Sequence, residues 1–290
     1  MTLASVFLVV LASFAHASWN LLAKRAASVG PVFVFAYNLV ACIAYAPWVI
    51  WLLAQNGQSW TWVGIGFVVA SGLIHLAYSL CLQRGYQVAD LSVVYPVARG
   101  TGPMLSFIGA ILILGETPSG TGLIGLALVV AGILLIATQG KLSAFLRPGG
   151  QAGVRWGVGT GGLIACYTVI DAYAVKTLGI APVVLDWFSN LMRFGLLLPL
   201  VLANPRKAMA AMNGYWPIAI GVGLLSPLSY ILVLAALSNG APLSLVAPLR
   251  EMSMMVGALM GMLILREPVG LWRLAGCGVL VMGAVLLSAS

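Results

Sequence analysis

Apolar runs of about 20 residues follow one another along almost the whole chain, and this feature restricts the possible folds most. About 20 helical residues cross roughly 30 Å of hydrocarbon. Only 7% of the residues are charged, whereas a soluble domain has about a quarter, and the mean hydropathy is +1.08. We therefore predict an all-α membrane protein with ten transmembrane helices. The predicted spans are residues 3–23, 31–53, 62–83, 91–114, 120–138, 157–176, 183–203, 215–237, 242–265 and 270–288.

Several classes of function find no support in the sequence. The net charge of +8 comes from basic residues scattered through short connections, so we expect no nucleic-acid partner. The four cysteines lie in apolar runs without metal-ligand spacing. The motifs HExxH, GxSxG and GxxxxGK(S/T) are absent from the sequence. We therefore expect no catalytic residue, no metal and no cofactor, and an intramembrane enzyme is the weakest alternative.

The second half of the chain repeats the first at a nearly constant offset. Identical residues lie 152 positions apart at Lys24/Lys176, Asn38/Asn190, Pro47/Pro199, Tyr78/Tyr230, Ser92/Ser244 and Pro96/Pro248, and 151 apart at Arg99/Arg250, Glu116/Glu267, Gly125/Gly276 and Gly132/Gly283. Because each half holds five spans, the halves cross the membrane in opposite orientations. Inverted repeats are typical of secondary transporters, with the binding site near the midplane between the repeats. We predict repeats at 1–138 and 155–290, joined by a linker at 139–154.

The loop charges predict an orientation. The loops after the odd-numbered spans hold ten of the 14 basic residues, and the opposite side holds only Lys176. Cytoplasmic loops carry an excess of lysine and arginine. This rule puts both termini outside the cytoplasm.

Ionisable residues lie well inside the predicted spans. The basic ones are Arg99, Arg193 and Arg250, and the acidic ones are Asp171 and Glu251. Each such charge costs about 2.5–3.5 kcal/mol on insertion scales, so each needs a partner or a wet cavity. A structural ion pair, such as Arg99 with Glu251, remains an alternative to direct binding.

Polar residues at helical spacing share faces with these charges and predict one cavity. The predicted substrate-binding residues are His16, Trp19, Asn20, His75, Tyr78, Tyr95, Arg99, Asp171, Arg193, Tyr230, Arg250 and Glu251. The same spacing aligns Tyr167 with Asp171, Asp186 and Asn190 with Arg193, and Ser226 with Tyr230, while Tyr37 and Asn38 are weaker candidates. His16 and His75 suit either a proton relay or hydrogen bonding between helices.

Two further features are shared by the halves. Pro96 and Pro248 each remove a backbone donor near mid-membrane, and matched helix interruptions point to a binding site. The fifth and tenth spans are rich in glycine and carry no charge over 121–137 and 279–287. We expect these two spans to form a scaffold or the contact of a homodimer.

The chain resembles the drug/metabolite transporter superfamily, EamA type. The resemblance lies in the two five-span halves and in the turns at Glu116-Thr117-Pro118 and Glu267-Pro268. The stretches HASWNLLAK at 16–24 and DLSVVYPVARGTGP at 90–103 resemble a subgroup associated with phosphonate use. The resemblance implies export of amino acids and other metabolites, or exchange of nucleotide sugars and sugar phosphates, by alternating access without a cofactor. Its nucleotide-sugar branch implies cytosolic termini, against the loop charges.

These observations predict a secondary transporter, an exporter of a small anionic or zwitterionic metabolite such as an amino acid or aminophosphonate. Its partners would be the small-molecule substrate, the lipid bilayer of the cell inner membrane, a proton as coupling ion, and a second copy in a homodimer. The alternatives are a flippase for a lipid-linked substrate and a cationic drug exporter of the same fold.

Overall fold

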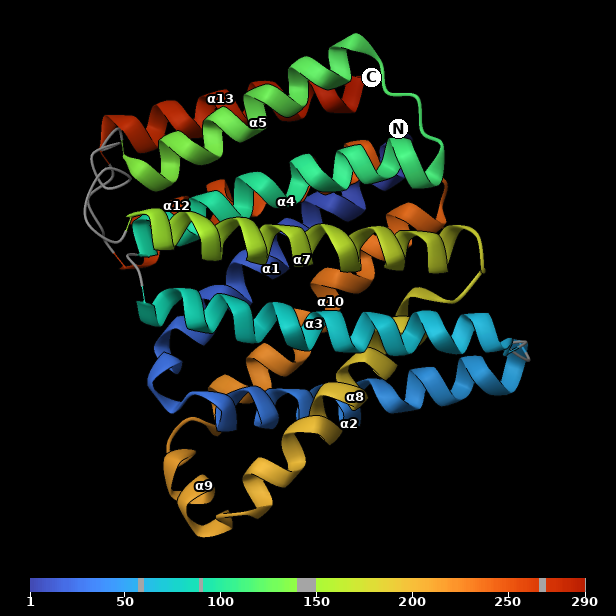
Figure 1. Cartoon of the computed structure of the whole chain (residues 1–290), viewed down its shortest axis with the longest axis vertical. Helices are drawn as coiled ribbons and strands as arrows, with labels where there is room; N and C mark the ends of the chain where they lie inside the picture. Colours follow the sequence, from blue (N-terminus) through green and yellow to red (C-terminus); the bar gives the residue numbers. More distant parts are fainter. Residues whose placement is uncertain (57–59, 89–90, 140–149, 266–269, 290) are drawn as a thin grey trace.

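The computed structural model describes residues 1–56, 60–88, 91–139, 150–265 and 270–289, and these residues form helices without any strand (Figure 1). Ten segments are long and apolar enough to cross a membrane, which confirms the predicted fold class. The helices are α1 (Leu3–Arg25), α2 (Pro31–Asn56), α3 (Trp62–Val88), α4 (Leu91–Leu114), α5 (Gly120–Thr138), α7 (Gly150–Lys176), α8 (Pro182–Leu202), α9 (Pro205–Ala211), α10 (Trp216–Ser238), α11 (Leu243–Leu249), α12 (Met252–Leu265) and α13 (Leu271–Ala289), with a 3₁₀ turn at Ala27–Val29.

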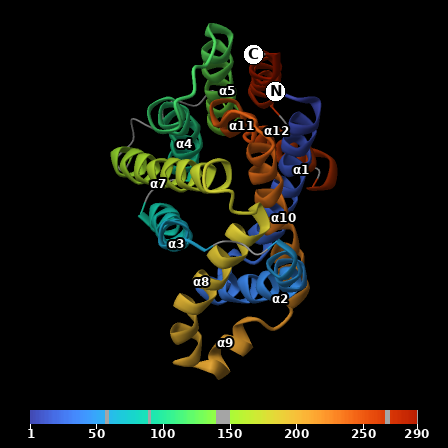
Figure 2. The same ribbon diagram turned by 90° about the vertical axis from the view of Figure 1, so that its right-hand side faces the viewer.

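The observed helices differ from the predicted spans in three places. The helix α7 begins at Gly150, within the stretch assigned to the linker. The short helix α9 lies in the connection between α8 and α10, outside the bundle (Figures 1 and 2) and outside every predicted span. The ninth span is divided into α11 and α12 at Arg250 and Glu251.

The two matched prolines lie in different local structures. Pro248 lies in the last turn of α11, directly before the break at Arg250 and Glu251. Pro96 lies inside α4, which is continuous. The helix is therefore interrupted near the proline of the second half, as expected, but not near the proline of the first half.

The packing of the helices follows the sequence repeat. The helix α5 packs on its counterpart α13, and α2 packs on α8. The pair α1 and α10 matches the pair α7 and α3, and the pair α4 and α7 matches the pair α12 and α1. Contacts that are exchanged in this way are typical of two halves related by a pseudo-two-fold axis.

Glycines bring α5 and α13 into close contact. A Cβ atom on Gly132 would lie 2.9 Å from the Gly276 carbonyl oxygen, and one on Gly283 would lie 2.8 Å from the Gly125 carbonyl oxygen. Small residues allow such close backbone approach in membranes. The glycine faces of these two helices are therefore occupied within one chain, and a homodimer through them, which stays a prediction, would use their outer faces.

Candidate functional site

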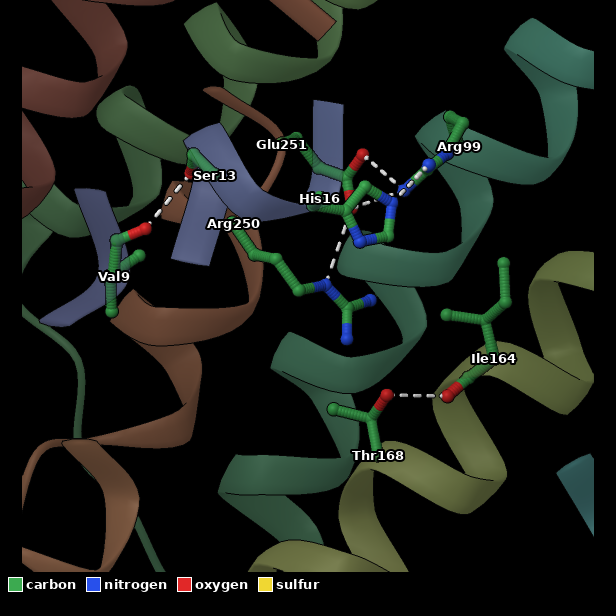
Figure 3. A network of polar contacts seen from close by, with 8 residues as sticks. All are labelled: Val9, Ser13, His16, Arg99, Ile164, Thr168, Arg250 and Glu251. Atoms are coloured by element: carbon green, nitrogen blue, oxygen red, sulfur yellow. Dashed lines mark hydrogen bonds and ion pairs between the residues drawn. The ribbon is translucent and has the colours of Figure 1, made fainter. Parts of the chain in front are cut away.

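Four polar residues, from α1, α4 and the break between α11 and α12, meet inside the bundle (Figure 3). Arg99 of α4 donates through Nη1 to both carboxylate oxygens of Glu251, at 3.3 and 3.1 Å. The Nη2 atom of Arg99 lies 2.8 Å from Nε2 of His16 in α1. Arg250 approaches the same carboxylate from the break between α11 and α12, with Nε 3.7 Å from Oε1. One acid thus lies between two arginines, and the local charge is positive.

The contact between Arg99 and His16 determines the hydrogen position on the histidine. A guanidinium group only donates hydrogen bonds, so Nε2 of His16 must accept. The ring is therefore neutral, with its proton on Nδ1. In this arrangement His16 positions Arg99 and carries no proton of its own for exchange at Nε2.

Arg250 and Arg99 differ in how their donors are used. The two terminal nitrogens of Arg250 have no hydrogen bond to any of the described residues, and Figure 3 shows them pointing away from Glu251. The neighbouring hydroxyl of Thr168 donates to Ile164 of its own helix instead, at 2.6 Å. The guanidinium of Arg250 is therefore available to a ligand.

Arg250 lines a cavity of about 240 Å³ between the two halves. Seven of the predicted substrate-binding residues line it, namely His16, Trp19, His75, Tyr78, Arg193, Tyr230 and Arg250. The indole N–H of Trp19 is buried and has no partner among the described residues. The cavity therefore offers donors to a ligand from both halves of the chain.

A row of polar residues on α8 forms another wall of the cavity. Asn190 donates to the Asp186 carboxylate at 2.7 Å, and Arg193 donates to the Asn190 amide oxygen at 2.7 Å. The spacing of these residues places them on one face of the helix, and all three line the cavity. This wall presents an acid and a base within two turns.

Aromatic rings surround the polar groups. The His75 ring stacks on Tyr167 with centroids 4.0 Å apart, and its Nδ1 donates to the Ser71 carbonyl at 2.9 Å. Tyr78 and Tyr230 contact Tyr167 edge to face. These rings give the cavity apolar surface between its polar groups, a combination found in most small-molecule sites.

Three predicted residues lie directly behind the cavity wall. Asp171 is completely buried and accepts a hydrogen bond of 2.6 Å from the Tyr230 hydroxyl group. Arg99 and Glu251 reach the wall through His16 and Arg250. They therefore support residues that line the cavity.

Two predicted residues are not brought to the cavity wall. Asn20 donates to the His16 carbonyl of its own helix at 2.8 Å. Tyr95 faces Arg99, with the guanidinium carbon 5.4 Å from its ring centre. Their helical spacing was correct, but it could not show which side of each stripe faces the cavity.

The predicted site list omitted several lining residues. Tyr37, Tyr167, Asp186, Asn190, Ser79, Ser226 and Ser229 line the cavity but were not in it. A signal existed for five of them, because the helical spacing aligned Tyr167, Asp186, Asn190 and Ser226 with predicted site residues and Tyr37 was a weaker candidate. Ser79 and Ser229 gave no sequence signal, because a serine in an apolar helix commonly bonds its own backbone, as both do here.

The comparisons with known proteins agree with this architecture. Residues 3–138 match the EamA-like transporter family. The multidrug resistance protein EbrB of Bacillus subtilis (strain 168) is 34% identical over 87 residues, which cover 30% of this chain and 68% of EbrB. A crystal structure described only as that of a protein has a TM-score of 0.77 at 14% identity, covering 100% of this chain and 98% of the other, and this likeness shows the fold alone. On the family match and the relationship to EbrB, the chain belongs to the EamA-like transporter family and is a multi-pass membrane transporter.

Proposed function

We propose that this transporter exports a small anionic or zwitterionic metabolite, such as an amino acid or aminophosphonate, by alternating access across the cell inner membrane. One observation supports an anionic or zwitterionic substrate. Arg250 lines the cavity, and its terminal nitrogens have no hydrogen bond to any described residue. A planar guanidinium suits a carboxylate, phosphate or phosphonate group. Such charge-assisted hydrogen bonds are about twice as strong as those between neutral groups.

The second charged wall favours a zwitterion. Asp186 lines the cavity and accepts a hydrogen bond only from the neutral amide of Asn190 among the described residues. An ammonium group could therefore bind Asp186 while the anionic group of the same molecule binds Arg250. The volume of about 240 Å³ lies below the 300–1,000 Å³ typical of pockets for drug-sized ligands, which favours a small metabolite.

We place the coupling proton on Asp171. The other candidate, Glu251, faces two arginines, and its protonation would leave their charges unbalanced. Among the described residues, Asp171 has no ion-pair partner and its Oδ1 atom has no hydrogen bond. Its Oδ2 atom accepts from Tyr230, which lines the cavity, so a change in its protonation can be transmitted to the substrate.

The direction of the cavity follows from the loop charges. Pro31 at the start of α2 and Leu82 near the end of α3 line the cavity. These helix ends lie on the side of the basic loops, which the positive-inside rule puts in the cytoplasm. This side would therefore receive the substrate for export.

A second candidate is the export of an organic cation. EbrB is named a multidrug resistance protein, and the cavity holds several tyrosine rings, which attract cations. Arg193 and Arg250 would repel an organic cation, and Asp186 alone among the lining residues supplies a negative charge.

Thermal stabilisation of the purified protein tests these candidates. A ligand that binds the native state raises the melting temperature by mass action. We expect stabilisation by glycine, aminomethylphosphonate or glycerol phosphate, and at least tenfold weaker binding in Arg250→Gln. The matched control Arg155→Gln removes an exposed arginine outside the cavity and should bind normally. Stabilisation by organic cations alone would overturn the proposed substrate class.

A further inference from the structure

The two ends of the bundle are packed differently, although the sequence repeat makes them equivalent. Pro31 and Leu82 line the cavity at one end. Their counterparts 152 residues later, Val183 and Leu234, are only 2% and 1% exposed and belong to the main hydrophobic core. Since the halves are inverted, these counterparts lie at the opposite end. The cavity therefore extends toward one end, and the other end is closed by packed side chains.

A polar cluster outside the cavity joins the two halves at this closed end. The carboxylate of Glu116, in the turn after α4, accepts a hydrogen bond from the Lys176 ammonium at 2.9 Å. It also accepts from the backbone N–H groups of Leu243 at 2.7 Å and Ser244 at 2.9 Å, in the first turn of α11. Lys176 donates in addition to the Ala241 carbonyl at 3.2 Å. Both oxygens of one acid from the first half thus hold the start of a helix in the second half.

This cluster differs from an ordinary helix cap. The usual cap is a serine, threonine, asparagine or aspartate adjacent to the helix. At α11 that position is Pro242, whose side chain makes no such bond, and the acceptor lies 127 residues away in sequence. The start of α11 therefore depends on contact between the halves.

The helix α11 connects this cluster to the cavity. It runs from Leu243, which is bound to Glu116, to Leu249, and Arg250 follows directly. Seven helical residues span about 10 Å. A displacement of α11 at the cluster therefore moves the arginine that we assign to the substrate.

We propose that Glu116, Lys176 and the first turn of α11 form a latch that holds one end of the transporter closed and opens when the transporter changes state. This inference rests on the alternating access proposed above. The closed end cannot open while one carboxylate bonds both halves across it. Release of α11 at Leu243 and Ser244 would let the halves separate there and would move Arg250 at the same time.

Accessibility of cysteines at the two ends tests the latch without a known substrate. In a variant with Cys42, Cys81, Cys166 and Cys277 replaced by alanine, the reporter Leu82→Cys lies at the open end and the matched reporter Leu234→Cys at the closed end. Each is labelled with a membrane-impermeant maleimide in proteoliposomes. We expect Glu116→Gln to raise the labelling rate of Leu234→Cys about tenfold and to lower that of Leu82→Cys. Lys176→Met should act in the same direction, more weakly, since the bonds to α11 remain.

The outcomes separate the latch from other causes. Ser119→Ala is the matched control, because Ser119 lies in the same turn but caps α5 of its own half. Faster labelling at both ends would mean loss of structure and would overturn the latch. Slow labelling of Leu234→Cys that is equal in the parent protein and Glu116→Gln would also overturn it, while leaving alternating access intact. A complete absence of labelling at Leu234→Cys in every variant would instead contradict alternating access itself.

Discussion

Arg99 of the first half and Glu251 of the second lie 3.1 Å apart at the centre of the bundle, with the Glu251 side chain only 1% exposed. Removing one partner of a buried pair leaves an uncompensated charge and costs about 3–5 kcal/mol. We expect Glu251→Gln to destabilise more than Arg99→Gln, because two arginines then face each other. The double variant should lose less than the sum of the single losses. Thermal unfolding in one detergent gives the four values, and additive losses would show that the two residues act independently.

Asp171 and Tyr230 form the contact to which we assign proton coupling. Asp171→Asn keeps the size of the side chain but removes the group that can bind and release the coupling proton. In proteoliposomes that transport aminomethylphosphonate, we expect the ratio of rates with and without a pH gradient to fall to about one. Tyr230→Phe should reduce this ratio without abolishing it, since Asp171 remains. An unchanged ratio in Asp171→Asn would move the coupling proton to another group.

Glu116 makes stability depend on pH. Burial alone would raise the pKa of this carboxyl group, but the hydrogen bonds from Ser244, Leu243 and Lys176 outweigh it and lower the pKa below its ordinary value of 4.5. A lowered pKa in the folded state contributes stability that is fully present above the unfolded value and is lost as pH falls through the folded value. We therefore expect the melting temperature of the parent protein to exceed that of Glu116→Gln at pH 7. The difference should shrink below about pH 4.5; a constant difference would contradict the shift.

The sequence repeat predicts a second latch of opposite effect. Lys24, Ser92 and Glu267 match Lys176, Ser244 and Glu116 in the sequence repeat, and the inversion of the halves predicts an equivalent cluster at the other end of the bundle. The turn at Glu267 and Pro268 lies outside the described residues. We expect Glu267→Gln to lower labelling of Leu234→Cys and to raise labelling of Leu82→Cys, the reverse of Glu116→Gln. Changes of the same sign in both variants would argue against alternating latches.

Substitutions at two glycines of α13 distinguish the effect of close helix packing on stability from the effect of helix propensity. A Cβ atom on Gly276 would lie 2.8 Å from the backbone nitrogen of Ile136, whereas one on Gly278 would meet nothing within 4 Å. Gly276→Ala should therefore destabilise the protein by about 1–3 kcal/mol, because backbone atoms must shift. Gly278→Ala should be neutral or stabilising by up to about 1 kcal/mol. Equal melting temperatures would mean that the contact between α5 and α13 adjusts without cost.

The repeat explains why so much of the fold could be predicted from the sequence. A span must be about 20 apolar residues long, and loops and charges are excluded from hydrocarbon, so composition alone separates membrane from loop. The structural differences between the two halves could not be predicted from the sequence repeat. The matched prolines Pro96 and Pro248 have the same local chemistry, yet α4 is continuous and the ninth span is broken.

The structure brings only some of the residues with a strong reason to avoid lipid to the cavity. Arg193, Arg250, His75 and Tyr230 line it, whereas Arg99, Asp171 and Glu251 lie behind its wall. Asn20 has the same helical spacing but bonds its own backbone, and Ser79 and Ser229, which line the cavity, have no feature that distinguishes them from other serines. Local hydrogen bonding competes with the cavity for such short side chains.

The sequence by itself determined that this chain crosses the membrane ten times, in two repeated halves, with charges that lipid would reject. These properties follow from solvation, which depends on residue type and spacing alone. Only the tertiary structure decided which of the buried arginines forms hydrogen bonds with Glu251. Arg99 and Arg250 are equivalent in the repeat, yet one is bound to Glu251 and His16 and the other keeps its terminal nitrogens for the cavity. A single acid cannot satisfy two arginines equally, and the packing of α4 against the break between α11 and α12 gives the hydrogen bonds of Glu251 to Arg99 rather than to Arg250, its neighbour in sequence.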